Sequence, residues 1–278
     1  AHCDEVKSLA TISLHNRKLP FDDAPDIQAL ASRLLKEPQQ QLRISIDKPL
    51  QHYVYQSLRT QLASLMQQQA NAGAVLVLNN QTGEVLAYVA NSGLVDDSIW
   101  VDGVQALRQA GSTLKPFLYG LALDKNLLTA ASVLDDQAIN VSTELGLYVP
   151  QNYEKDFKGA VTVRRALASS LNIPAVLTLN KVGVEDFWRA LNELGFKLEQ
   201  QSDYYGHALA LGGADITLWQ LANAYRALAN GGQKTELSLA LNTQHTEAKA
   251  VLSPQASFIV ADILSDRNAR SLSFGYEN

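Results

Sequence analysis

The stretch from Ala110 to Phe117 constrains this chain most, because it joins a reactive residue pair to the start of an apolar helix. The apolar residues that follow it predict a helix from Ser112 to about Asp124. Residues three apart lie on one face of a helix, so this helix would set the Ser112 hydroxyl beside the Lys115 amine. A serine hydroxyl becomes an effective nucleophile when a nearby base takes its proton, and a neutral lysine can be that base.

A structural explanation of the same residues is also open. Gly111 and Ser112 before an apolar run form a common helix start, with Ser112 as the N-cap. Pro116 fits the first turn: it lacks the N–H that would otherwise bond back to the Ser112 carbonyl. Ser-x-x-Lys occurs often by chance, so the pair needs support from the rest of the chain. Catalysis would also require burial and neighbouring cations to lower the pKa of Lys115.

The composition is that of an ordinary globular protein and excludes several functions. The 278 residues are 46% hydrophobic and 18% charged, enough for one large domain or two modest ones. A net charge of −5 argues against non-specific nucleic-acid binding. Cys3 is the only cysteine, and beside His2 alone it makes no zinc site. We find no membrane-spanning run and no signal peptide, and expect either a cytosolic protein or a portion of a longer one.

The chain divides into a weakly patterned start and a longer domain of helices and strands. We interpret residues 1–45 as a linker or the tail of a preceding module, and residues 46–278 as the domain. The domain should open with a helix and a β-hairpin over residues 74–90, whose apolar first strand we expect to be covered on both faces. An irregular polar region over residues 134–159 should follow. Helices should then start at the caps Thr162, Thr217 and Ser253, and two more should span Pro174–Lys181 and Val184–Leu194, the last ending at Gly195. Four aromatic residues on helical stripes are expected in the core: Trp188, Trp219, Tyr225 and Phe258.

A second polar pattern supports the first. Ser170 and Asn172 form a Ser-x-Asn sequence 58 residues after Ser112, between two predicted helices. A short loop there can present both side chains to a cleft. Ser170 could relay a proton between Lys115 and a leaving group, and the Asn172 amide can donate to and accept from a peptide-like substrate. The alternative is that both side chains cap the neighbouring helices.

Several segments, in the same order, resemble the transpeptidase domain of penicillin-binding proteins, specifically the class A proteins of the 1C branch. Arg108–Phe117 is similar to the family's nucleophile segment, although Ala110 stands where the family usually has proline. Ala166–Pro174 is similar to its Ser-x-Asn segment. The resemblance covers about residues 20–278 and includes three more matches: the Gly73–Ala90 hairpin, the glycine-containing segments Leu209–Gly213 and Ala229–Gly232, and the linker-like residues Pro20–Leu35.

The resemblance implies a fold and a reaction. The fold would be α+β, with helices on both faces of an antiparallel sheet and a smaller helical subdomain, as in serine β-lactamases. The reaction would be that of a peptidoglycan D,D-transpeptidase, which cross-links stem peptides in cell-wall biosynthesis and is acylated by β-lactams. Ser112 would be the catalytic nucleophile and form the acyl-enzyme, Lys115 and Ser170 would move protons, and Asn172 would bind the substrate amide.

The resemblance also implies a setting for the chain. No metal and no organic cofactor is implied, and no nucleic-acid partner. The protein would act in the periplasm, or more generally outside the cytoplasm. A membrane anchor and a glycosyltransferase domain would belong to other parts of the same polypeptide, outside this chain.

One departure concerns the family's third motif, Lys-Thr/Ser-Gly. Lys234-Thr235-Glu236 comes only 64 residues after Ser170 and has Glu236 in place of glycine, so we reject it as that motif. We therefore expect the transpeptidase domain, residues 46–278, to lack its C-terminal strand or strands with the motif. Two alternatives stay open: a degenerate penicillin-binding scaffold, and a related serine acyl enzyme such as a carboxypeptidase, a β-lactamase or a β-lactam sensor.

Overall fold

A computed structural model describes most of the chain, as two compact units. The described residues are 27–37, 41–70, 72–91, 101–139, 141–143, 146–148, 151–152, 156–241, 247–275 and 277. Those of the first unit lie in Ala1–Leu78, Glu84–Gln105 and Ser238–Asn242, and those of the second lie in Asn79–Gly83, Ala106–Leu237 and Thr243–Asn278. Within the described residues, helices are combined with five two-stranded antiparallel pairs, so the predicted mixed fold class is confirmed. No described helix has the length and apolar character needed to cross a membrane.

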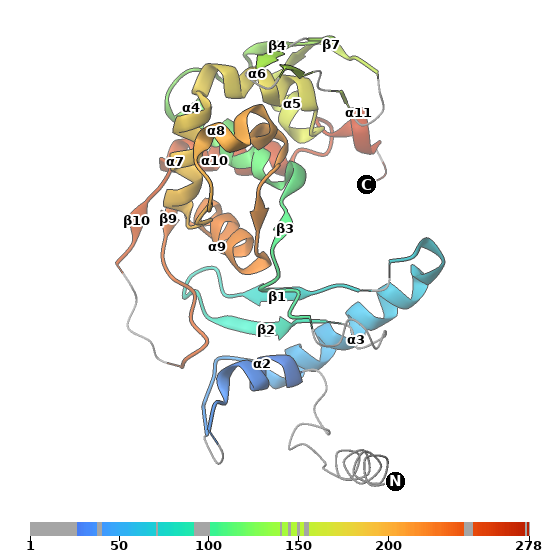
Figure 1. The fold of residues 1–278 in the computed structure, drawn as a ribbon, viewed down its shortest axis with the longest axis vertical. Coiled ribbons are helices and arrows are strands. Elements are labelled where there is room, and N and C mark those ends of the chain that lie inside the picture. The colour runs from blue at the N-terminus through green and yellow to red at the C-terminus, as the bar shows by residue number, and fades with distance from the viewer. Residues whose placement is uncertain are drawn as a thin grey trace, which may run out of the picture. The chain divides into compact units, whose positions relative to one another are not determined.

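The first unit contains a long helix packed against a β-hairpin (Figure 1). Its elements are α2 (Gln28–Leu34), α3 (Lys48–Ser64), the 3₁₀ turn η1 (Met66–Gln68), β1 (Val75–Leu78) and β2 (Val85–Val89). Asp47 caps α3, because its carboxylate accepts a hydrogen bond from the Leu50 N–H. Gln51 of α3 donates to the carbonyl of Tyr88 and accepts from its N–H, which fixes the helix on β2.

The burial of β1 differs from the prediction, and part of the predicted linker packs on this unit. The expected coverage of the first hairpin strand on both faces is wrong: every residue of β1 is half-buried, whereas β2 is mostly buried. The reason is that α3 packs mainly over β2. In the segment interpreted as a linker, Leu30 is 1% exposed and Arg33 donates to the Tyr88 hydroxyl. The domain boundary near residue 45 stays a prediction.

The second unit is largely helical. Its helical elements are η3 (Gly111–Leu114), α4 (Lys115–Asp124), α5 (Val163–Ala168), α6 (Asn172–Val182), α7 (Val184–Leu194), α8 (Ser202–Tyr205), η4 (Gly206–Leu211), α9 (Leu218–Ala229), α10 (Pro254–Ser265) and α11 (Ser271–Phe274). Its strand pairs are β3 (Arg108–Gln109) with β8 (Asp215–Ile216), β4 (Val133–Asp136) with β7 (Gly159–Thr162), β5 (Val141–Thr143) with β6 (Gly146–Tyr148), and β9 (Gln233–Lys234) with β10 (Lys249–Ala250). The polar region over residues 134–159 therefore contains paired strands that its composition did not predict.

The predicted helix boundaries are largely confirmed, because the capping residues act locally. The hydroxyls of Thr162, Thr217 and Ser253 each accept a hydrogen bond from the backbone N–H three residues later. Gly195 ends α7 in the left-handed conformation, with φ of 98°. The helix predicted from Pro174 starts two residues earlier, at Asn172.

The centre of the second unit is α4, in which every residue from Lys115 to Leu123 is buried. Helices α5, α6, α7 and α10 pack around it (Figure 1). A helix that is apolar on all sides is stable when it is covered on all sides. Phe117 adds edge-to-face contacts with Phe196 and Tyr225, at ring-centroid distances of 5.7 and 5.2 Å. As a result, Lys115 is buried in a stretch whose residues up to Leu123 are otherwise uncharged.

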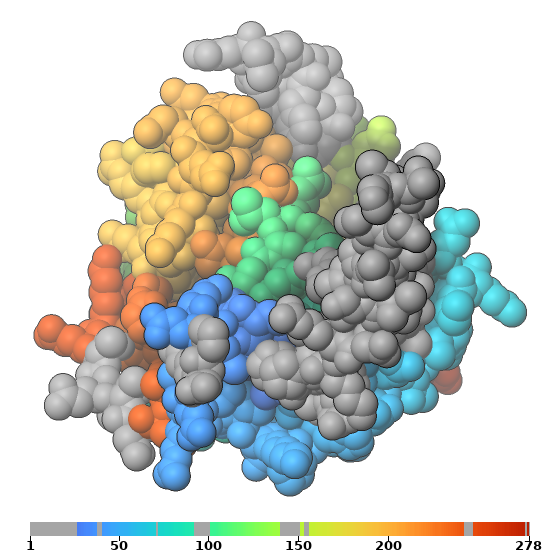
Figure 2. All heavy atoms as spheres, turned by 60° about the horizontal axis from the view of Figure 1, so that its bottom comes forward, coloured from blue at the N-terminus to red at the C-terminus, as the bar shows by residue number. Residues whose placement is uncertain are grey.

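The four aromatic residues expected in the core have different environments. Trp188 and Tyr225 are partly buried against the core, and Trp219 is half-buried. Phe258 is 71% exposed, so its prediction is wrong: it lies on the outer side of α10, although its spacing is helical. Trp188 belongs to α7, which packs against α8. The gold atoms of this part of the chain lie together on the face drawn in Figure 2.

A close backbone contact guides the chain into α4. The Ala110 N–H donates to the carbonyl of Ala214, and the Gly111 N–H donates to the carbonyl of Gly212, at 3.0 Å in both cases. Gly212 has φ of 78°, and a Cβ atom built on it would overlap the Gly111 carbonyl. Only glycine allows both that conformation and that approach. Gly212 therefore helps to place the turn that carries Ser112.

We predict that Gly212→Ala lowers the free energy of unfolding by about 3 kcal/mol, because a left-handed alanine is strained and its methyl group displaces the backbone. Gly206→Ala is the matched control, because Gly206 also has positive φ but faces open space. It should cost about 1–2 kcal/mol. Denaturant unfolding of both variants measures the difference. Equal losses would show that the contact between Gly212 and Gly111 contributes nothing.

Candidate active site

The predicted pair, Ser112 and Lys115, lies at the junction of η3 and α4. A 3₁₀ turn replaces the first turn of the expected α-helix, and its residues include Ser112. Ser112 is exposed, whereas Lys115 is 1% exposed. Both residues line the same hollow in the second unit, together with Ser170 and Tyr225. The Ser112 hydroxyl is thus open to a ligand, and Lys115 is buried at the same hollow.

The amine of Lys115 joins α4 to the turn between α5 and α6. Its Nζ atom lies 2.5 Å from the Ser170 carbonyl oxygen, 2.7 Å from Asn172 Oδ1 and 3.2 Å from Ser170 Oγ. Three of the four residues predicted from sequence are therefore in direct contact. The fourth, Ser112, shares the hollow, and its hydroxyl is not among these three hydrogen-bond partners of the amine.

Burial changes the acid–base behaviour of Lys115. Loss of water around the amine lowers its pKa from 10.5 to about 7. Desolvation disfavours the charged form of a lysine, and it is the cause of this shift. The neighbouring cations that the sequence analysis invoked are not needed. Near pH 7, a substantial fraction of the amine is neutral and able to accept a proton.

Ser170 has an unusual backbone conformation that serves this contact. Its φ is 56°, in the left-handed region that residues other than glycine rarely adopt. Such a residue costs about 1–2 kcal/mol and is found where surrounding structure holds it in place. Here the conformation reverses the chain between α5 and α6, and the carbonyl and the hydroxyl of Ser170 both reach Lys115.

Asn172 is held from two sides. Its Oδ1 accepts from Lys115, and its Nδ2 donates to the carbonyl of Gln151 at 2.7 Å. The side-chain amide therefore has a defined orientation, with its oxygen toward the lysine. Asn172 is half-buried and lines an adjoining part of the hollow, which shares Ser112 and Ser170 with the part around Lys115, so its second Nδ2 hydrogen is available to a ligand.

The hollow extends past Ser112 and Asn172 to residues that the sequence analysis did not select. These are Asn152, Asp156, Lys158, Ser273 and Phe274. Ser273 and Phe274 belong to α11, about 100 residues from the Ser-x-Asn turn along the chain, and no local pattern indicates that they approach it. Asn152 comes two residues after Pro150, in the segment that the sequence analysis treated only as part of an irregular polar region.

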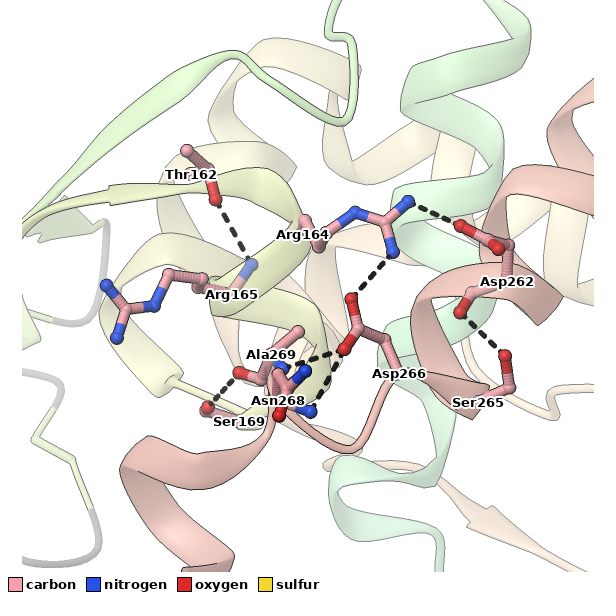
Figure 3. A network of polar contacts seen from close by, with 9 residues as sticks. All are labelled: Thr162, Arg164, Arg165, Ser169, Asp262, Ser265, Asp266, Asn268 and Ala269. Atoms are coloured by element: carbon pink, nitrogen blue, oxygen red, sulfur yellow. Dashed lines mark hydrogen bonds and ion pairs between the residues drawn. The ribbon is translucent and has the colours of Figure 1, made fainter. Parts of the chain in front are cut away.

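An ion-pair network fixes α10 and the following turn to α5 (Figure 3). The guanidinium of Arg164 pairs with Asp262 and with Asp266, the latter at 3.0 Å. The Asp266 carboxylate also accepts from the N–H groups of Asn268 and Ala269, and these hydrogen bonds with the Arg164 contact lower its pKa. One oxygen of the Asp266 carboxylate thus holds the turn that leads into α11, and the other binds Arg164 of α5.

Ser169 continues this connection to the site. Its hydroxyl donates to the carbonyl of Ala269 at 3.0 Å (Figure 3), and its own carbonyl accepts from the Ser273 hydroxyl at 2.8 Å. Ser169 directly precedes Ser170. The position of α11 along the hollow is therefore set by the same turn that carries Ser170.

The rejected triplet lies elsewhere in the second unit. Thr235 Oγ1 accepts a hydrogen bond of 2.8 Å from the buried guanidinium of Arg226, and Lys234 pairs with Glu236. None of the three triplet residues lines the hollow around Ser112. This placement agrees with its rejection as a site motif. Among the described residues, no three histidine, cysteine or acidic side chains gather closely enough to hold a metal ion.

Comparisons with known proteins agree on one family. Residues 73–274 match the family model "Penicillin binding protein transpeptidase domain". The chain is 36% identical over 196 residues to penicillin-binding protein 1C of Escherichia coli K12, covering 69% of this chain and 25% of that protein. It is 31% identical over 221 residues to penicillin-binding protein 1F of Bacillus subtilis 168, covering 78% of this chain and 30% of that protein.

A solved structure gives the same result. The crystal structure of penicillin-binding protein 1A from Haemophilus influenzae matches with a TM-score of 0.62 and 26% identity, covering 71% of this chain and 35% of that chain. The chain thus spans about a quarter to a third of its relatives' length, and these relatives are class A penicillin-binding proteins. Because the matched family segment covers most of the chain and contains Ser112, Lys115, Ser170 and Asn172, the chain belongs to the penicillin-binding protein transpeptidase domain family.

Proposed function

We propose that this chain forms the acyl-transfer site of a peptidoglycan D,D-transpeptidase, with Ser112 as the nucleophile. The observation that carries the proposal is the pairing of an exposed hydroxyl with a buried amine whose pKa is about 7, in one hollow. Acyl transfer by serine requires this combination of an accessible nucleophile and a base that is neutral at working pH.

The contacts of Lys115 suggest how the proton moves. A neutral amine has two N–H groups and one lone pair. The Ser170 carbonyl and Asn172 Oδ1 can only accept, so they take the two N–H groups and leave the lone pair for a hydroxyl. After the amine takes the Ser112 proton, its third N–H has an acceptor in Ser170 Oγ, 3.2 Å away. Ser170 then passes a proton to the departing group.

The reaction has two acyl-transfer steps. Ser112 Oγ bonds to the carbonyl carbon of a D-Ala-D-Ala stem peptide, the peptide C–N bond breaks, and D-alanine leaves with the relayed proton. An amine of a second stem peptide then attacks the ester, and Ser112 regains its proton. With a β-lactam, the ring amide opens on the same oxygen and its nitrogen stays tethered, which blocks the second step.

Asn172 and backbone groups stabilise the reacting amide. The free Nδ2 hydrogen of Asn172 donates to the substrate. The Ser112 N–H supplies one donor for the developing oxyanion. We propose that the second donor belongs to a strand with Lys-Thr/Ser-Gly, a triplet absent from these 278 residues. The action of such an enzyme on stem peptides places it outside the cytoplasm. Its membrane anchor and glycosyltransferase domain would be in other parts of the same polypeptide.

A second candidate is a penicillin-binding scaffold without turnover. A scaffold would retain the fold, but acylate slowly or not at all. A carboxypeptidase would transfer the acyl group to water, and a β-lactamase would release an opened β-lactam within seconds. Supplying labelled donor and acceptor peptides separates these functions, because only a transpeptidase produces the cross-linked dimer.

We predict that a fluorescent penicillin labels the natural polypeptide that carries this chain, and that Ser112→Ala abolishes the label because the acyl ester cannot form. Ser265→Ala makes the same chemical change outside the hollow and should label like the wild type. Denaturing gels of the labelled proteins give the readout. Labelling that persists in Ser112→Ala would exclude this serine, and absence of label from the wild type would favour the scaffold.

The pKa of Lys115 predicts a pH dependence. Raising the pH through about 7 converts the amine to its neutral form, so the acylation rate should rise and reach a plateau above about pH 8. At pH 6 it should be about a tenth of the plateau, because about a tenth of the amine is then neutral. Lys115→Arg should remove the rise, since arginine stays protonated. A wild-type rate that is flat from pH 5.5 to 8.5 would contradict a lysine base.

A further inference from the structure

Two buried polar residues beside the hollow have no role in the mechanism above. Asp136, the last residue of β4, is 0% exposed, and Asn152 is 6% exposed. Burying an ionised carboxylate costs several kcal/mol unless hydrogen bonds replace its water. A carboxylate buried as deeply as that of Asp136 therefore requires hydrogen-bond donors.

The Asp136 carboxylate is held by N–H groups. Asn152 Nδ2 lies 2.9 Å from its Oδ1 and 2.8 Å from its Oδ2, and the Lys158 backbone N–H donates to Oδ2 at 2.8 Å. Because a carboxylate only accepts, Asn152 must turn its NH₂ group toward it. The carbonyl of Asp156, 2.9 Å from the same Nδ2, requires the same orientation. The Asn152 amide oxygen is therefore directed away from Asp136.

That oxygen reaches the Ser-x-Asn turn. Asn152 Oδ1 accepts the backbone N–H of Asn172 at 2.9 Å. The first N–H groups of a helix have no partner within the helix. Leu171, the residue at the N-cap position of α6, provides no side-chain cap. Asn152 thus caps α6 from 20 residues upstream.

The adjacent residue holds the side chain of the same asparagine. The Gln151 carbonyl accepts from Asn172 Nδ2, while Asn172 Oδ1 accepts from Lys115. Residues 151 and 152 therefore hold both the main chain and the side chain of Asn172. We propose that Asp136 and Asn152 are a positioning pair that orients Asn172 and, through it, the amine of Lys115. The kinetic consequence of this pair rests on the function proposed above.

The pair differs from an ordinary buried polar contact in where its hydrogen bonds end. A purely structural pair would stabilise the β4–β7 region and leave the site unchanged. Here Asp136 orients the Asn152 side chain so that its oxygen accepts the N–H of Asn172, the residue that contacts Lys115. A shift of about 1 Å at a reacting group can cost about 100-fold in rate. Loss of this orientation should therefore slow acylation more than its effect on stability predicts.

The first test compares two asparagine-to-alanine variants in the natural polypeptide. Asn152→Ala removes the proposed cap. Asn223→Ala is the matched control, because Asn223 is also 6% exposed and donates to the Thr235 carbonyl, away from the hollow. Acylation by a fluorescent penicillin should be about 10- to 100-fold slower in Asn152→Ala and within about twofold of wild type in Asn223→Ala. Equal rates in the two variants, each folded by circular dichroism, would overturn the proposal.

Exchanging the two side chains tests the direction of their hydrogen bond while keeping their size. Asp136→Asn places an NH₂ group against donors, and Asn152→Asp places two carboxylates together, so each single variant should acylate slowly. The double variant Asp136→Asn/Asn152→Asp restores a donor facing an acceptor and keeps an acceptor for the Asn172 N–H. It should recover at least tenfold over the slower single variant. A double variant no faster than either single variant would overturn the pair.

Amide hydrogen exchange gives a readout that does not depend on catalysis. The Asn172 N–H should exchange at least tenfold faster in Asn152→Ala than in wild type, and be unchanged in Asn223→Ala. If the wild type is not acylated but this exchange difference is found, the proposed function fails and the positioning contact stands. If the wild type is acylated and neither rate nor exchange responds to Asn152→Ala, the positioning pair fails and the proposed function stands.

Discussion

The burial of one lysine amine is the constraint on which the site depends. Burying a charged ammonium away from water is costly. The cost falls when the amine loses its proton, or when hydrogen-bond acceptors surround it. Both occur at Lys115: its pKa falls to about 7, and three oxygens lie within hydrogen-bond distance. The same contacts that make burial tolerable also suit proton transfer, because they accept the N–H groups and leave one position for a hydroxyl.

Supplying those oxygens imposes requirements on the rest of the second unit. Ser170 must adopt a left-handed conformation, and its turn must be held between α5 and α6. Ser169 ties that turn to the α10–α11 connection, which the Arg164 ion pairs fix in turn. Before η3, Gly212 allows its own backbone to lie close to that of Gly111, where the chain enters η3. The strain and the close approach are local, and packing over the whole unit compensates for them.

Sequence alone was sufficient for features whose cause is local. The hydroxyls of Thr162, Thr217 and Ser253 cap helices because each hydroxyl and the backbone N–H that donates to it are three residues apart. Ser112 and Lys115 could be selected because their spacing and the apolar run after them are visible in one segment. The resemblance to the family then gave the expectation that Ser170 and Asn172 belong to the same site as Ser112 and Lys115. In the structure the Lys115 amine contacts both Ser170 and Asn172.

The tertiary structure decided what depends on neighbours distant in sequence. Helical spacing marked Phe258 as apolar, but whether another element covers that side of α10 is a property of packing, and the residue is exposed. The proximity of α11 to the hollow, and the contact of Asn152 with Asn172, join segments 20 to about 100 residues apart. Composition and periodicity describe which surfaces a segment prefers to bury, but not which partner buries them. The sequence by itself therefore determined many of the helix boundaries and the choice of candidate site residues, whereas the strand pairs of residues 134–159, the orientation of the site residues and the depressed pKa of Lys115 arose only from long-range packing.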